Sequence, residues 1–234
     1  MVSKQDLMKS AANYALSRIK KIKNQQEARL RIWNDAIQVH SYHDVLSLKA
    51  GNIVRIDNHI GIVISLRNST LLMISPFQGV AFWGAEWCEH LPYLNESGNS
   101  FDLRTNATSF DNGQKNLQAI EEIMNDGIHS FPSFKFCVEK GNGWYLPSIR
   151  ELELFKNTEL LQIVNEVLVK FGLDTLIPND GKNVFWSSTD NDSDTEYYTS
   201  AYALSISTNG EVNSIVQQKA ETIKVIPFYQ HYIY

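Results

Sequence analysis

Cysteine is scarce in this chain: its 234 residues include only two, Cys88 and Cys137. Two cysteines are too few for a disulfide scaffold, so a hydrophobic core must hold the fold together. Two states stay open for them, a single disulfide in an exported protein or two buried thiols. Proline and glycine are also sparse, at 6 and 12 residues, which leaves no composition for a long disordered linker.

Long apolar runs and basic stripes are missing as well. No stretch approaches the roughly 20 apolar residues of a membrane span, and residues 1–10 carry charges without an apolar signal core. We therefore expect a cytoplasmic or virion-associated protein, at a cell surface only if a signal has been removed. The net charge is −5 and the only basic run is Arg18 to Lys23, so nucleic acid is not an expected partner.

Large hydrophobic side chains are plentiful: 43% of residues are hydrophobic, with ten Tyr and five Trp. At roughly 150 residues per domain, the length indicates one large domain with an appendage. We place an N-terminal helix at residues 1–40 and a compact domain at residues 48–234.

The predicted helix, residues 4–38, has a narrow apolar stripe. Its members recur in alternating steps of four and three, with a break at Gln26: Met8, Ala12, Ala15, Ile19, Ile22, Leu30, Trp33 and Ile37. That spacing is typical of a coiled-coil seam with one stutter. Two interpretations are equally supported, a helix lying on its own domain and a stalk that joins several copies as a homo-oligomer.

The compact domain mixes strands and helices. Strands are predicted at residues 51–56, 61–66, 70–75, 183–188, 202–207, 211–216 and 222–227, with an Asn209-Gly210 hairpin turn. Helices are predicted at residues 114–125, 132–140 and 159–171. The expected fold class is therefore α+β.

The segment Gly-Asn-Gly-Trp-Tyr-Leu-Pro-Ser-Ile-Arg-Glu-Leu at 141–152 is the most informative. Its two glycines permit a tight turn, and Pro147 ends the extended run. Ser148 and Glu151 have the spacing of a capping box, which opens a helix.

Three ordered motifs carry a family resemblance: residues 141–152, Phe-Trp-Ser-Ser-Thr at 185–189, and Lys-Val-Ile-Pro at 224–227. Together they resemble the bacterial C-type-lectin-like domains found at the ends of collagen-like adhesins and in phage proteins. The resemblance spans about residues 48–229. It implies a twisted antiparallel sheet, flanking helices and a long irregular ligand-facing region. Related folds include retroelement-diversified variable proteins and formylglycine-generating enzymes. Ile226 departs from the family, which usually has Arg there.

Reactive chemistry finds little support. Trp144 and Trp186 are expected as core anchors whose indole N–H groups bond to backbone. Ser187 and Ser188 have no His and carboxylate at a recognisable spacing, so a serine hydrolase is not expected.

Metal and cofactor sites are equally unsupported. The sequence from Asp190 starts like a calcium loop, but Thr195 and Ala201 replace the required Gly and Glu. His40 and His43 have no local third ligand. We expect no metal, no cofactor and no enzymatic activity.

A polar rim is the expected binding site. Residues 189–200 contain no aliphatic side chain apart from threonine methyls, so we predict a surface loop whose composition resembles an antibody paratope. The opposite interpretation is an uninvolved surface loop. The candidate ligand-binding residues, including two from the following hairpin, are Asp192, Asp194, Tyr197, Tyr198, Asn213 and Gln217.

These features predict a non-catalytic module that binds a glycan or protein surface, such as an adhesin or a phage receptor-binding protein. The first alternative is a structural component of a larger assembly such as a virion. The second is an enzyme related to formylglycine-generating enzymes, which requires Cys88 and Cys137 to lie close together in an open cleft.

Overall fold

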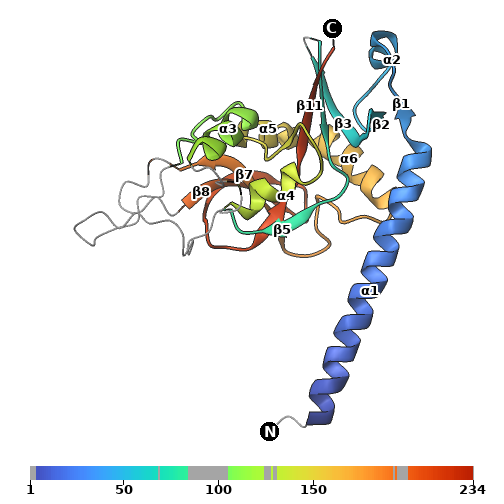
Figure 1. The fold of residues 1–234 in the computed structure, drawn as a ribbon, viewed down its shortest axis with the longest axis vertical. Helices are drawn as coiled ribbons and strands as arrows, with labels where there is room; N and C mark the ends of the chain where they lie inside the picture. The colour runs from blue at the N-terminus through green and yellow to red at the C-terminus, as the bar shows by residue number, and fades with distance from the viewer. Residues whose placement is uncertain are drawn as a thin grey trace.

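A long helix, α1 (Lys4–Asp35), joins a body made of two β-sheets and several short helices in the computed structural model (Figure 1). The structure describes residues 4–67, 69–83, 105–123, 128, 131–191, 193 and 200–233. The predicted α+β class, with its N-terminal helix, is confirmed. The two ends of the chain lie at opposite ends of the molecule.

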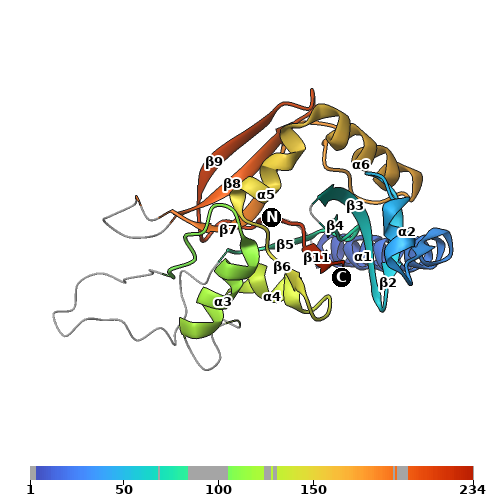
Figure 2. The same ribbon diagram turned by 90° about the horizontal axis from the view of Figure 1, so that it is seen from above.

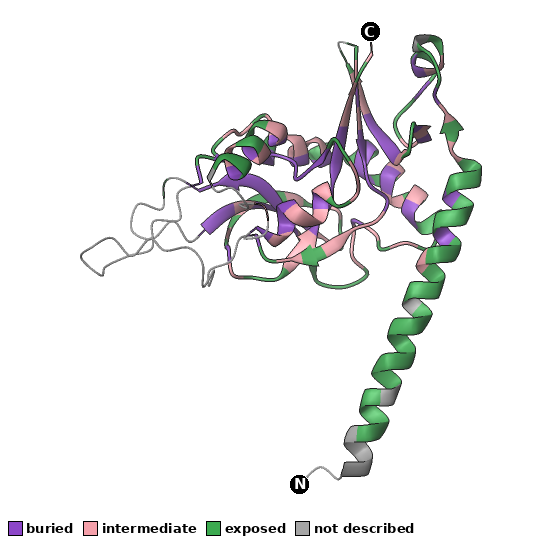
Figure 3. Ribbon diagram, viewed as in Figure 1, coloured by how far each residue is buried: buried purple, intermediate pink, exposed green. Residues whose placement is uncertain are grey.

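Most of α1 projects away from the body. Figure 3 shows it exposed along most of its length, with burial confined to the end that meets the body. The buried residues there are Ala28 and Ile32, which lie one turn apart and were not in the predicted stripe. Described members of that stripe are exposed: Met8, Ala15, Ile19, Ile22, Leu30, Trp33 and Ile37.

The helix ends three residues before the predicted boundary. Ile37 and Gln38 form a short strand, β1 (Ile37–Gln38), paired in parallel with β2 (Ile53–Ile56). An unpredicted helix, α2 (Tyr42–Leu46), follows, and Ser41 and Asp44 form its capping box. This tertiary pairing ended the helical pattern earlier than periodicity indicated.

The first sheet has the order β1-β2-β3-β4-β11-β6. Its remaining strands are β3 (His59–Arg67), β4 (Thr70–Ile74), β6 (Trp144–Tyr145) and β11 (Phe228–Tyr232). The last strand, β11, was not predicted, yet it lies between β4 and β6 and is antiparallel to both. The C-terminal residues are therefore part of the sheet interior.

The second sheet has the order β5-β10-β7-β8-β9. Its strands are β5 (Gly79–Ala81), β7 (Lys182–Asp190), β8 (Ser200–Ser207), β9 (Val212–Gln218) and β10 (Ile223–Val225). The pairing of β10 with β7 is parallel and the others are antiparallel. The strands are thus divided between two sheets where one antiparallel sheet was expected.

Helices cover both faces of the second sheet (Figure 2). One side carries α3 (Gly113–Ile123) and α4 (Pro132–Val138). The other carries α5 (Ile149–Leu152), a 3-10 turn η2 (Glu153–Lys156) and α6 (Thr158–Lys170). The predicted Ser148–Glu151 capping box is present at the start of α5.

Three hydrophobic clusters make up the core. The central core lies between the sheets and includes Ile62, Tyr145, Phe185, Leu204, Ile226 and Phe228. The Trp186 core lies beneath α3 and α4 and includes Trp83, Ile120, Phe134, Cys137, Leu146 and Trp186. The Trp144 core covers the outer face of the first sheet and includes Val54, Val63, Leu71, Met73, Trp144 and Tyr229.

One short segment reaches all three clusters. Trp144, Tyr145 and Leu146 are consecutive, and each enters a different core. Neighbouring residues of an extended chain point to opposite sides, which allows this division. Gly143 precedes them at φ +87°, and a Cβ there would come 2.8 Å from the Tyr229 ring, so glycine is required.

The three sequence motifs contact one another directly. The Ser188 amide donates to the Pro147 carbonyl at 2.7 Å, which joins the second motif to the first. Lys224 pairs with Phe185 in the parallel ladder. The chain then leaves the third motif into β11, where Phe228 pairs with Tyr145. The motifs therefore form one hydrogen-bonded frame.

Candidate functional site

The candidate site is the end of the second sheet where the chain leaves β7 and returns in β8. Two of the predicted ligand-binding residues, Asn213 and Gln217, are on β9, an edge strand. Gln217 pairs with Ala201 near this end, whereas Asn213 pairs with Ser205, close to the β8–β9 turn at the opposite end of the strand. The other four, Asp192, Asp194, Tyr197 and Tyr198, lie outside the described residues.

Asn213 and Gln217 share one face of β9. They flank Ile215, which packs against the Trp186 core, so all three side chains lie on that side of the strand. Asn213 is exposed, and its Nδ2 donates to Glu211 Oε1 at 3.0 Å. Gln217 is half-buried and pairs with Ala201 in the ladder. Asn213 is accessible to a ligand, and Gln217 is partly so.

Ser214 points to the other face of the strand. Its Oγ donates to Glu153 Oε1 at 2.6 Å, which ties β9 to η2. Ser214 therefore anchors one face of the edge strand, and on the other face Ile215 packs against the Trp186 core while Asn213 stays exposed.

The ends of the predicted surface loop are buried, which corrects the expectation that residues 189–200 stay outside the core. Thr189, Asp190, Asn191 and Ser200 are each less than 9% exposed. Asn191 closes the loop: its amide donates to the Ser200 carbonyl at 3.3 Å, and its Nδ2 donates to Ser200 Oγ at 3.0 Å. Polar side chains are buried here because each has a partner, which hydrophobic patterning does not reveal.

A buried ion pair lies directly beneath this closure. Lys219 Nζ is 2.6 Å from Asp190 Oδ1, and both side chains are 3% exposed. Thr105 Oγ1 donates to the other carboxylate oxygen at 2.6 Å. The Lys219 ammonium also lies 4.6 Å from the centre of the Trp83 ring. Sequence reasoning missed this group, since no local spacing links its members.

Trp83 donates two hydrogen bonds that hold it in place. Its indole N–H donates to the Ser187 carbonyl at 2.6 Å, and its own amide donates to the Lys219 carbonyl at 3.1 Å. Ala107 also contacts β7, since the Asp190 amide donates to the Ala107 carbonyl at 2.8 Å. Four separate stretches of chain therefore meet at the ion pair.

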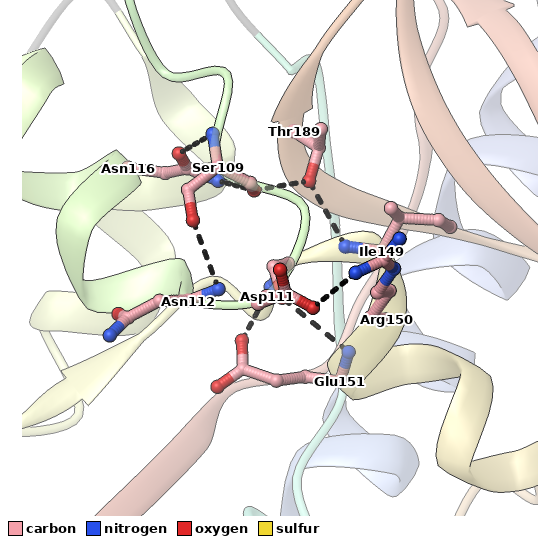
Figure 4. A network of polar contacts seen from close by, with 9 residues as sticks. Ser109, Asp111, Asn112, Asn116, Ile149, Arg150, Glu151 and Thr189 are labelled. Carbon is pink, nitrogen blue, oxygen red and sulfur yellow. Dashed lines mark hydrogen bonds and ion pairs between the residues drawn. The ribbon is translucent and has the colours of Figure 1, made fainter.

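A second polar network supports the same end of the sheet (Figure 4). Thr189 Oγ1 donates to the Ser109 carbonyl at 3.0 Å and accepts from the Ile149 amide at 3.0 Å. Asn116 both accepts from the Ser109 amide and donates to its carbonyl, each at 2.8 Å. Arg150 and Asp111 form an exposed ion pair at 2.8 Å. These contacts hold residues 109–116 against β7 and α5.

Glu151 is the buried carboxylate of this network. It accepts from the Ser148 amide at 2.7 Å, the Gly113 amide at 2.9 Å and the Tyr145 hydroxyl at 2.8 Å. Burial nevertheless raises the pKa of Glu151, since the hydrogen bonds only partly offset the desolvation. Burial, with the nearby Glu151 charge, raises the pKa of Tyr145 well above its usual range.

The hydroxyls and the thiol in this region are engaged or buried. Ser187 Oγ donates to the Tyr202 carbonyl at 2.7 Å, and Ser188 Oγ accepts from Asn116 Nδ2 at 2.9 Å. Cys137 is fully buried, and desolvation raises the pKa of its thiol well above the usual range, which keeps it protonated. Cys88 lies outside the described residues, so the predicted proximity of the two cysteines stays a prediction.

The two tryptophans of the motifs are both buried, as predicted. Trp186 donates its indole N–H to the Ala81 carbonyl at 3.0 Å. Trp144 instead donates to a side chain, His59 Nδ1, at 3.0 Å. The expectation of a backbone acceptor is therefore confirmed for Trp186 and wrong for Trp144.

Metal ligands do not gather in the part of the chain that the structure describes, where no three His, Cys, Asp or Glu residues are placed to share an ion. Within the same residues, no helix combines the length and the apolar character needed to cross a bilayer.

Comparison with known proteins gives a likeness of fold. No family model matches the chain, and no curated protein matches it. Among solved structures, it is similar to a fimbrial protein from Bacteroides ovatus ATCC 8483, with 16% sequence identity and a TM-score of 0.51. The match covers 75% of this chain and 44% of that one, so this chain spans less than half the length of the fimbrial protein.

Proposed function

We propose that the protein is a non-catalytic, adhesin-like binding module with a C-type-lectin-like frame, and that it recognises a glycan or a protein surface. The proposed contact surface runs from the end of the second sheet that carries the chain from β7 to β8 along the edge strand β9. It consists of the six residues chosen from sequence, Asp192, Asp194, Tyr197, Tyr198, Asn213 and Gln217.

The observation that carries this proposal is the buried polar group at the ends of the 189–200 segment, which forms a fixed base for the contact surface. Asn191 and Ser200 bond to each other, and the Asp190–Lys219 pair lies buried below them. Burying two charges costs solvation free energy that their attraction does not always recover, so such a pair is better explained by the geometry it enforces than by stability. A fixed base lowers the entropy cost of binding through the residues it supports.

Two further observations support the same function. The three motifs that resemble the C-type-lectin-like family form one hydrogen-bonded frame. A solved structure with a similar fold is a fimbrial protein. The buried state of Ser187, Ser188 and Cys137 supports the non-catalytic part of the proposal.

Glycan and protein arrays with the intact chain test this function. The informative variants are Tyr197→Ala/Tyr198→Ala and Asn213→Ala. The first removes two large aromatic contact surfaces, so we expect at least a tenfold loss of affinity for any array hit. Gln162→Ala, on the exposed face of α6, is the matched control and should keep full affinity.

A ligand whose affinity is unchanged in both variants would place the binding surface elsewhere. No hit on either array with a folded protein would remove the proposed function.

A role in a larger assembly is the second candidate, and α1 favours it. Large apolar side chains in its projecting part are exposed rather than packed on the body: Met8, Tyr14, Leu16, Ile19 and Ile22. Apolar side chains gathered on an exposed helix face are stabilised when another surface covers them, so a partner for this segment is expected.

A further inference from the structure

A pocket lies away from the proposed contact surface, where α1 meets the β2–β3 turn and the end of α4. Its volume is about 320 Å³, which is near the lower limit for small-molecule sites. Its lining includes Arg29, Asn58, His59, Phe77, Lys140 and Trp144.

Two cations share this pocket. Lys140 is half-buried, with Nζ 4.1 Å from the centre of the Phe136 ring. Arg29 comes from α1, with Cζ 4.8 Å from the centre of the Phe77 ring. Among the described residues, neither cation has a carboxylate within ion-pair distance. Two like charges that face one small space repel each other, and an anion between them would relieve that repulsion.

Burial and the nearby Arg29 charge both disfavour the charged form of the Lys140 side chain. Desolvation is the larger cause and Arg29 the second, and both lower the pKa of Lys140. The nearby Glu139 acts in the opposite direction. Glu139 also lines the pocket, but its side chain is 62% exposed and lies 3.9 Å from Lys135 Nζ. The charge that faces the pocket therefore remains positive.

His59 adds a fixed hydrogen-bond donor. Its Nδ1 accepts from the Trp144 indole, so the proton of the neutral ring is on Nε2. The ring packs against Tyr229 with centroids 4.6 Å apart. Burial lowers the pKa of His59, His231 lowers it further, and Asp57 opposes them. At neutral pH the imidazole is an uncharged donor held in one orientation.

We infer that this pocket binds a small ligand through a carboxylate or phosphate group, which would pair with Lys140 and Arg29 while His59 and Asn58 provide hydrogen bonds. Arginine and lysine are the usual partners of both groups. Because Arg29 belongs to α1 and Lys140 to the body, a bound anion would also link the helix to the body. This site is independent of the proposed function.

Isothermal titration calorimetry at constant ionic strength tests the inference with three probes: inorganic phosphate, glucuronate and N-acetylneuraminate. Glucose is the neutral control. We expect saturable binding of at least one anion and none of glucose. Lys140→Gln and Arg29→Gln should each weaken binding at least tenfold. Lys115→Gln and Arg18→Gln, which remove exposed cations elsewhere, should leave it unchanged.

Binding of phosphate alone would identify a phosphate site, and binding of the sugar acids alone a carboxylate site; either supports the inference if the variants behave as stated. Lack of saturable binding by all three anions would overturn it. Equal losses in the pocket variants and the control variants would overturn it too. Thermal unfolding of each variant shows whether it is folded.

Discussion

Lys219 Nζ lies 2.6 Å from Asp190 Oδ1, and the two side chains are each 3% exposed. The pair joins the end of β7 to the residue that follows β9. Thr105 and Trp83 complete its surroundings, so four stretches of chain converge on it. Removal of either charge should therefore disturb the base of the proposed contact surface.

Lys219→Met should lower the free energy of unfolding by about 3–5 kcal/mol, because it leaves the Asp190 carboxylate buried without its counter-charge. Urea denaturation measures this loss. Lys219→Met/Asp190→Leu should recover much of it, since neither charge then remains buried.

Lys156→Met is the control, because Lys156 forms an exposed pair with Glu153 at 2.7 Å, and it should cost less than about 1 kcal/mol. A loss from Lys219→Met as small as that of the control would show that the pair is not desolvated.

Glu151 should make stability depend on pH. Burial raises its folded-state pKa above the ordinary value of 4.5. At pH values between 4.5 and the folded-state pKa, the folded protein holds the Glu151 proton more tightly than the unfolded chain does. The Glu151 contribution is therefore complete below pH 4.5 and is lost as the pH rises through the folded pKa.

Urea denaturation of the native protein and of Glu151→Gln across this pH range measures the effect. The difference in unfolding free energy, native minus variant, should shrink as the pH rises, because glutamine does not ionise. A difference that stays constant with pH would contradict the raised pKa.

Substitution by alanine should lower stability much more at Ile32 than at Leu30. Ile32 is 1% exposed in the central core, whereas Leu30 is 67% exposed. Ile32→Ala should cost about 2–5 kcal/mol through lost burial and a residual cavity. Leu30→Ala should change stability by less than about 0.5 kcal/mol. Thermal unfolding monitored by circular dichroism compares them. Similar effects would mean that α1 meets the body through a different face.

The exposed stripe of α1 should join copies of the chain more strongly as salt increases. In a parallel pair with Ile19 and Ile22 at the seam, Arg18 of one copy would lie beside Lys23 of the other. The helix carries eight Lys or Arg and three Asp or Glu, so self-association opposes a net repulsion that salt screens. Sedimentation equilibrium at about 0.05 M and about 0.5 M salt measures the change.

Ile19→Gln/Ile22→Gln should abolish this association. A monomer at both salt concentrations would argue against the stalk. Association that weakens with salt would instead indicate that the basic side chains meet an acidic surface.

Local signals accounted for much of the secondary structure. The Ser148–Glu151 spacing located the start of α5, and the Asn209-Gly210 pair located the β8–β9 turn. Gly172, at φ +68°, ended α6 close to the predicted position. Each of these signals acts within a few residues, so it can be recognised without knowing the rest of the fold.

The sequence by itself determined the α+β class, most of the element positions and the motif segments. Only the tertiary structure decided that β11 enters the first sheet, that Ile32 rather than Leu30 is buried, and that Thr189 and Asp190 are inside. The physical reason is distance along the chain. Thr105 and Asp190 are 85 residues apart, and Trp83 and Ser187 are 104 apart. Whether a polar side chain can be buried depends on such remote partners, and no local pattern encodes them.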